Sequence, residues 1–243
     1  MIVDVIILSN TATEKHYNLL LNTINTLHNS EQNFQFNIIL VESSSIPFHE
    51  TESLCNVYIN FKESFNYNKA LNQAFSFAHS DYVVIANNDL EFEQGWFFQI
   101  QKLMISNNLG SACPFDPNWV GHQPVNKNNE LLLGYDVRLH IVGWCIVATA
   151  TTIKCLFPFD ELFDFYFQDN DYAERLKKMR IKHGLITVSI VHHKLSQSQD
   201  LMSISQEEKY IQDKIIFKNK WPTRQEQFNR FFADCWKKML GII

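Results

Sequence analysis

Residues 81–89 read DYVVIANND, an apolar run that passes directly into two asparagines and an aspartate. β-branched and aromatic residues in such a run predict a buried strand over 81–86, and the polar residues predict a turn at its carboxyl end. Two earlier segments show the same pattern. The run over 2–8 closes on Ser9, Asn10 and Thr11, and the run over 36–41 closes on Glu42 and three serines.

Helical spacing of apolar residues over 14–29 and 66–79 separates these three predicted strands. Strands that alternate with helices predict an α/β fold with a parallel sheet, and such sheets bind ligands at the carboxyl ends of their strands. We therefore expect the polar clusters at 9–11, 42–45 and 87–89 to lie along one edge.

The second half of the chain is less regular. It predicts a strand pair or one buried strand over 139–150, a helix over 171–182 and a strand over 185–191 that ends on two histidines. A further helix is expected over 206–220. An amphipathic stretch follows Trp221, and its apolar side carries Phe228, Phe231, Phe232, Trp236 and Leu240.

Composition narrows the classes of function. The chain has 243 residues, 46% of them hydrophobic, which favours one globular domain with a sizeable core. A net charge of -5 with 21 Lys and Arg leaves no basic stripe for nucleic acid. The apolar runs are too short for a transmembrane segment, so we expect a cytoplasmic protein. The five cysteines are scattered and form no Cys-x-x-Cys pair, which indicates reduced, buried thiols. Peripheral membrane contact by the C-terminal stretch and the oligomeric state stay open.

Asp89 is the first candidate site residue, because an acid at a ligand-binding sheet edge suits a hard cation. Mg²⁺ or Mn²⁺ takes carboxylate oxygens and completes its shell with substrate phosphates and water. Asparagine and aspartate also favour turns, which explains the same position without a metal.

Two further signals concern acids and histidines. Residues 165–171, FYFQDND, place Asp169 and Asp171 at the start of a predicted helix, where acids serve as helix caps or as a general base. His192 and His193 close the strand over 185–191. A histidine there is either structural or a second metal ligand beside Asp89.

In order and flanking sequence, these signals resemble the inverting GT-A glycosyltransferases of family 2, close to the rhamnosyltransferase-like members. The similar segments run from residue 2 to about 221. They are Val3–Asn10, Ile38–Ser44, Asn66–Ala74, Asn87–Asp89, Gly143–Cys145, Phe159–Glu161, Gln168–Asp171 with Arg175–Leu176, His193–Ser198 and Lys220–Trp221.

The resemblance implies a single GT-A (Rossmann-like) domain over 1–243, with a central mostly parallel sheet flanked by helices. Its nucleotide-binding half would be 1–90, its acceptor-binding half 91–205, and its C-terminal helices 206–243. The implied donor is a UDP- or dTDP-linked sugar, with rhamnose as a family-level expectation, and the implied acceptor is a glycan hydroxyl.

The resemblance also implies roles for residues. Asp169 would be the general base, with Asp171 in the same run, while Asp89 and His193, or His192, would hold Mn²⁺ or Mg²⁺. Gly143 and Trp144 would meet the acceptor, with Trp144 either stacked on an acceptor sugar or simply a buried aromatic. The donor would contact Ser9, Asn10, Glu42, Asn66, Asn87 and Asn88. Lys69 is either a phosphate contact or a solvated residue of its helix.

Several positions depart from the family pattern. Asn87 stands where the first acid of the metal motif is usual, Gln168 replaces a glutamate, and Asn68 and Ala74 replace glycines. These losses keep open a non-catalytic protein that binds a nucleotide sugar or a glycan. A nucleotidyltransferase is disfavoured, because SNTAT at residues 9–13 lacks a glycine-rich, basic phosphate loop.

Overall fold

The computed structural model describes residues 1–48, 50–122, 125, 128–194, 205–224 and 226. Helices and strands alternate through its first third and mix less regularly afterwards. The elements in chain order are β1 (Ile2–Ser9), α1 (Glu14–Asn29), β2 (Gln35–Glu42), η1 (Thr51–Leu54), β3 (Val57–Asn60), α2 (Tyr67–Phe75), β4 (Tyr82–Asn87), β5 (Leu90–Phe92), α3 (Trp96–Asn107), β6 (Ser111–Phe115), η2 (Val120–His122), β7 (Leu131–Leu133), β8 (Cys145–Thr149), α4 (Ala150–Leu156), α5 (Gln168–Met179), β9 (His183–His193) and α6 (Ser205–Lys220).

The strands form one sheet in the order β3-β2-β1-β4-β8-β6-β9-β5, and β7 pairs with β9. The first four strands in this order, β3, β2, β1 and β4, are parallel to one another. The carboxyl ends of β1, β2 and β4 therefore lie at the same edge of the sheet. β8 runs antiparallel to both β4 and β6, and β9 is parallel to β6. The predicted α/β class is confirmed, with a large central sheet flanked by helices.

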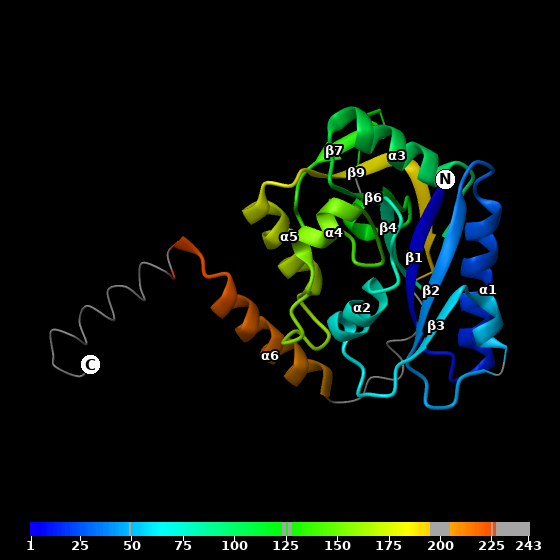
Figure 1. The fold of residues 1–243 in the computed structure, drawn as a ribbon. Helices are drawn as coiled ribbons and strands as arrows, with labels where there is room; N and C mark the ends of the chain where they lie inside the picture. Colours follow the sequence, from blue (N-terminus) through cyan, green and yellow to red (C-terminus); the bar gives the residue numbers. More distant parts are fainter. Residues whose placement is uncertain (49, 123–124, 126–127, 195–204, 225, 227–243) are drawn as a thin grey trace, which may run out of the picture.

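Helices cover both faces of the sheet (Figure 1), with α1 on one side and α2, α4 and α5 on the other. Apolar strand residues such as Val5 and Ile6, on opposite faces of β1, are both fully buried, as expected for a sheet covered twice. Aromatic side chains fill the layer under α3, where Trp96 and Phe97 pack against Phe36.

The sequence predicted β1, α1, β2, α2 and β4 in the first part of the chain, and α5, β9 and α6 further on. The stretch over 139–150 forms a single strand, β8, because residues up to Trp144 make turns before it. β3, β5, α3, β6, β7 and α4 were not predicted. The amphipathic stretch over 228–240 lies outside the described residues. Among the residues described, no helix is both long and apolar enough to cross a bilayer.

The side chain of Asp4 links β1 to β2 and to the segment that precedes β4. Its buried carboxylate accepts hydrogen bonds from Asn37 Nδ2 (2.6 Å), His79 N (2.6 Å) and Ser80 N (2.7 Å).

Asp4→Ala would leave these donors without an acceptor, so we expect the free energy of unfolding to fall by about 3 kcal/mol. Urea denaturation measures this loss. Asp81→Ala, an exposed acid at the start of β4, is the control, and an equal effect of both variants would contradict the assignment.

Candidate functional site

The carboxyl ends of β1 and β4 meet at the predicted edge. Leu8 is in register with Asn87 across the parallel pair, and Asn88 Nδ2 donates a hydrogen bond to Ser9 Oγ (3.4 Å). The backbone N–H of Asn87 donates to the carbonyl oxygen of Trp144 (2.9 Å). The structure therefore brings the turn after β1, the turn after β4 and the Gly143–Trp144 segment to one place.

Asp89 faces His193 at this edge. Asp89 Oδ1 lies 3.4 Å from His193 Nε2, and the two side chains are 4% and 13% exposed. The antiparallel pairing of β5 with β9 sets this geometry, because Leu90 is opposite His193 and the backbone N–H of Lys194 donates to the carbonyl oxygen of Asp89 (3.0 Å). The predicted partnership of Asp89 with a histidine at the end of β9 thus has a direct contact.

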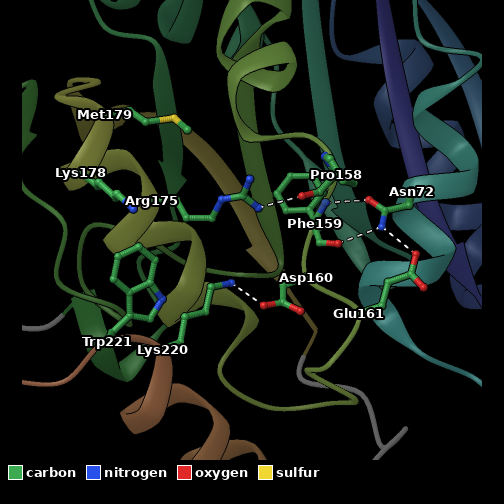
Figure 2. A pocket seen from close by; sticks show the side chains of 10 residues that line it. All are labelled: Asn72, Pro158, Phe159, Asp160, Glu161, Arg175, Lys178, Met179, Lys220 and Trp221. Atoms are coloured by element: carbon green, nitrogen blue, oxygen red, sulfur yellow. Dashed lines mark hydrogen bonds and ion pairs between the residues drawn. The ribbon is translucent and has the colours of Figure 1, made fainter.

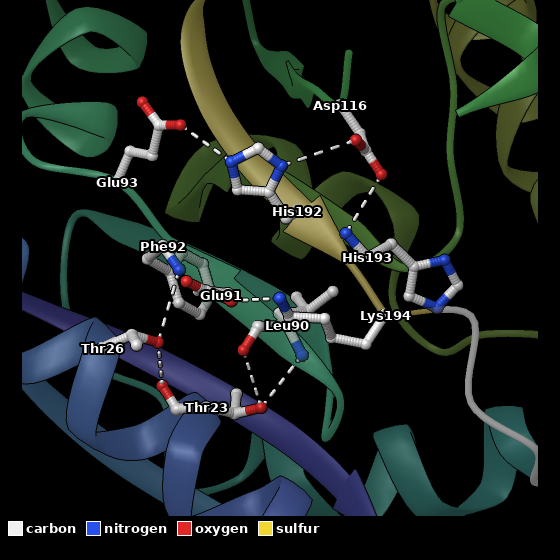
Figure 3. Close-up of polar contacts among 10 residues, drawn as sticks. All are labelled: Thr23, Thr26, Leu90, Glu91, Phe92, Glu93, Asp116, His192, His193 and Lys194. Atoms are coloured by element: carbon white, nitrogen blue, oxygen red, sulfur yellow. Dashed lines mark hydrogen bonds and ion pairs between the residues drawn. The ribbon is translucent and has the colours of Figure 1, made fainter. Parts of the chain in front are cut away.

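His192 points the other way, as neighbouring residues of a strand do. Figure 3 shows its ring between Glu93 and Asp116, whereas the ring of His193 turns away from both acids. His192 Nε2 lies 2.7 Å from Glu93 Oε1, and its Nδ1 lies 3.8 Å from Asp116 Oδ1. Of the two candidate histidine ligands, the structure therefore places His193, and not His192, beside Asp89.

Asp116 and Trp119 belong to this cluster, although neither was predicted from the sequence. Asp116 is buried, and its Oδ2 accepts a hydrogen bond from the backbone N–H of His193 (3.0 Å). The ring of Trp119 lies 5.9 Å from that of His193. Asp116 follows the short apolar strand β6, so it carries the same strand-end signal that singled out Asp89.

Trp144 stacks on His193 in an offset, nearly parallel arrangement, with ring centroids 5.6 Å apart and an interplanar angle of 16°. One face of the indole is thus occupied by a side chain, which limits the stacking on an acceptor sugar expected of Trp144. Trp144 Nε1, His193 Nδ1 and Gln168 Nε2 are buried and have no hydrogen-bond partner among the described residues. Buried polar atoms without partners are uncommon in proteins, and the stacked rings of Trp144 and His193 carry two of them, which suits a ligand that supplies partners.

Asp169 lies against Gly143 in the first turn of α5. A Cβ atom at Gly143 would come within 2.5 Å of Asp169 Oδ1, so only glycine admits the carboxylate here. Burial raises the pKa of Asp169 to about 6, while hydrogen bonds from the backbone N–H groups of Gly143 and of Asp169 itself act in the opposite direction. A carboxylate whose pKa approaches neutrality is suited to accept and release a proton.

Glu42 is turned inward at the same sheet edge. Its Oε1 accepts hydrogen bonds from the N–H groups of Thr11 (3.0 Å) and Ser44 (2.8 Å), and its Oε2 accepts one from Thr11 Oγ1 (3.0 Å). The side chain is fully buried. Instead of presenting a free carboxylate to a nucleotide, Glu42 joins the turns that follow β1 and β2. Asn10 beside it is exposed, and its Oδ1 accepts from Ala12 N.

Asn66 and Lys69 at the start of α2 also have partners within the protein. Asn66 caps α2 through its Oδ1 and the N–H of Lys69 (2.9 Å), and its Nδ2 donates to the carbonyl oxygen of Glu161 (2.9 Å). Lys69 forms an ion pair with Glu63. The structure does not bring these two residues into contact with Asp89 or Asp169.

Asp171 faces away from Asp169 although the two are two residues apart. Its Oδ1 lies 2.8 Å from Lys220 Nζ and accepts a hydrogen bond from Trp221 Nε1 (2.7 Å). Lys220 and Trp221 line a hollow of about 720 Å³ beside α5 (Figure 2), together with Arg175 and Lys178. Neither Asp89, His193, Trp144 nor Asp169 lines this hollow.

The residues at the edge fit a divalent cation held jointly with a ligand. No group of three or more His, Cys, Asp or Glu side chains suitable for a metal occurs among the residues described. Asp89 and His193 offer one oxygen and one nitrogen, and their 3.4 Å separation is compatible with an ion about 2.1 Å from each. Substrate phosphates and water commonly complete such a shell.

Comparisons with known proteins bear on this geometry. The glycosyl transferase family 2 model matches residues 5–141, more than half of the chain. No curated protein sequence matches.

Among solved structures, S. aureus TarS 1-349 in complex with UDP-GlcNAc is similar with a TM-score of 0.63 and 13% identity. The match covers 87% of this chain and 64% of that one. Mannosyltransferase PcManGT from Pyrobaculum calidifontis, in complex with GDP-Man and Mn²⁺, has a TM-score of 0.58 and 14% identity, covering 81% and 57%. At these identities the likeness concerns the fold, and the chain spans less than two thirds of either protein.

The burial of Asp169 predicts a pH-dependent cost in stability. Its pKa is about 6 in the folded protein against 3.8 ordinarily, so the folded state binds the proton more tightly and loses stability as pH rises from about 4 to about 6. Asp169→Asn removes this charge. We expect its free energy of unfolding to exceed that of the unsubstituted protein by about 1–3 kcal/mol at pH 8, and the gain to shrink towards pH 4.5.

Urea denaturation at the two pH values tests this. A destabilised Asn variant at pH 8, or a difference that does not change with pH, would contradict the dehydrated placement of Asp169.

Proposed function

We propose that this chain, which belongs to glycosyl transferase family 2, transfers a sugar from a nucleoside-diphosphate sugar to a hydroxyl group of a glycan, with inversion at the anomeric carbon. The observation that carries the proposal is the convergence of two features on the Gly143–Trp144 segment. The Asp89–His193 pair packs against Trp144, and the carboxylate of Asp169 lies against Gly143.

Asp169 is the proposed general base. As the acceptor oxygen forms its bond to the anomeric carbon and the bond from that carbon to the diphosphate oxygen breaks, Asp169 takes the hydroxyl proton. Its pKa of about 6 leaves it mostly ionised at neutral pH, yet a better proton acceptor than an ordinary aspartate. The backbone N–H of Gly143 holds the carboxylate in place.

Asp89 and His193 are the proposed protein ligands of Mn²⁺ or Mg²⁺, with the donor diphosphate completing the shell. When bound, the ion would neutralise negative charge that develops on the leaving nucleoside diphosphate. Asn87 contributes no charge, so Asp89 is the carboxylate that this segment offers. His192 is assigned to the support of β9 through Glu93 and Asp116.

The donor nucleotide is proposed to lie along Ser9, Asn10, Asn87 and Asn88, at the ends of β1 and β4. Glu42 would act indirectly, because its carboxylate fixes the turns that form this wall. We assign Asn66 and Lys69 to the structure of α2 and Asp171 to the anchoring of α5, in place of donor and catalytic roles.

A non-catalytic protein that binds a nucleotide sugar is the second candidate, since Asn87 and Gln168 are uncharged where the family usually has acids. The test is release of nucleoside diphosphate with Mn²⁺ from UDP-GlcNAc, GDP-mannose and dTDP-rhamnose, each with and without glycan acceptors. Slow hydrolysis or transfer supports the enzyme. Binding of a donor with neither reaction would leave the non-catalytic function.

Asp169→Asn is expected to lower the rate of transfer by at least about 100-fold and to leave donor affinity nearly unchanged, because a general base acts in the chemical step. Steady-state kinetics and calorimetry measure the two quantities. A parallel loss of donor affinity would show that Asp169 holds the donor instead.

Asp89→Ala is expected to weaken donor binding in Mn²⁺ by at least about tenfold, and to change it little in the presence of a chelator. Calorimetry with and without Mn²⁺ compares it with Asp81→Ala, which removes an exposed acid from the other end of β4. Unchanged Mn²⁺-dependent binding in Asp89→Ala would refute the metal assignment.

A further inference from the structure

The start of α5, which carries the proposed base, has no side-chain hydrogen bond that caps the helix. Phe167, the residue before the helix, has a left-handed backbone (φ 65°), and its side chain makes no capping hydrogen bond. A bulky residue rarely adopts this conformation without support from its surroundings. Something outside α5 must therefore hold Phe167 and the Gln168–Asp169 turn that follows.

Asp213 of α6 supplies this support on one side. Its carboxylate is 1% exposed and accepts three hydrogen bonds from successive backbone N–H groups of the segment that enters α5. Asp164 N lies 3.2 Å from Oδ1, and Phe165 N and Tyr166 N lie 3.0 and 2.8 Å from Oδ2. Charge-assisted bonds to consecutive amides fix the direction in which the backbone approaches Phe167.

The C-terminal end of α6 supplies support on the other side. Lys220 and Trp221 both contact Asp171, and Lys220 Nζ also lies 2.6 Å from Asp160 Oδ2. Between the two sets of contacts, the ring of Phe167 stacks on Phe217 (5.4 Å, 28°). α6, the orange helix in Figure 1, thus contacts the chain both before and after Asp169.

We propose that α6 acts as a brace, meaning that its contacts hold the Gln168–Asp169 turn in place. Asp213 is then a positioning residue that sets where Asp169 meets the acceptor hydroxyl. This inference rests on the proposed function, because it takes Asp169 as the base. Without the Asp213 carboxylate, the N–H groups of Asp164, Phe165 and Tyr166 lose their charged acceptor, and the turn is free to shift Asp169 away from Gly143. A displacement of this kind lowers the rate of the chemical step more than it weakens donor binding.

The test compares Asp213→Asn with Glu208→Gln in the full chain. Glu208 is an exposed acid on the same helix, so its variant makes the same change of charge outside the brace. Trp221→Phe keeps an aromatic ring but removes the hydrogen bond to Asp171, and it serves if Asp213→Asn folds poorly. Kinetics give kcat and the donor KM, and hydrogen exchange of peptides spanning 160–172 reports on the turn.

We expect Asp213→Asn to lower kcat at least about tenfold with a donor KM within about threefold, and amides in 164–172 to exchange at least about tenfold faster. Trp221→Phe should change kcat and the exchange rate in the same directions but by less. Glu208→Gln should leave both quantities as they are in the unsubstituted chain. If Asp213→Asn leaves kcat unchanged, or if its faster exchange is spread evenly over the sheet, the proposal that α6 holds the Gln168–Asp169 turn is wrong. If the unsubstituted chain transfers no sugar, the proposed function fails, and exchange in 164–172 alone decides whether α6 holds the turn.

Discussion

The close approach of Asp169 to Gly143 is the constraint on which the candidate site depends. A Cβ atom at residue 143 would overlap the Asp169 carboxylate, so glycine is required there, and the carboxylate loses part of its hydration in this position. Its pKa rises to about 6 as a result. The same segment continues into Trp144, whose ring packs on His193, so the placement of the acid and that of the Asp89–His193 pair are linked through two consecutive residues.

Three buried carboxylates, those of Asp116, Glu42 and Asp213, stabilise this arrangement. Asp116 fixes the backbone of His193, Glu42 joins the turns after β1 and β2, and α6 holds the entry to α5. Each is a buried carboxylate that accepts backbone N–H groups, which satisfies the donors left open where strands and helices end. The acids around the site therefore fall into two groups. Some organise the backbone, whereas Asp89 and Asp169 face the place proposed for substrate.

An acid that directly follows a buried strand is the same sequence signal in both groups, so the sequence does not distinguish a carboxylate that organises the backbone from one that faces substrate. Glu42 and Asp89 both follow buried strands, and only the positions of Thr11 and Ser44 in the fold show that Glu42 is turned inward. Alternation along β9 predicts that one of His192 and His193 faces Asp89, but the choice depends on the register of β9 with β5. α3 was missed because it begins at Gly95 in a left-handed conformation, without a side-chain cap or an acid in its first turn. The division of the chain into nucleotide-binding and acceptor-binding halves stays a prediction.

The most direct test of this account is a crystal structure of the chain with a nucleoside-diphosphate sugar and Mn²⁺. We expect anomalous density for one ion in contact with Asp89 and His193 and with the diphosphate, and the anomeric carbon on the side of the site that Asp169 faces. An ion bound elsewhere, or a donor whose sugar lies away from Gly143 and Asp169, would contradict it.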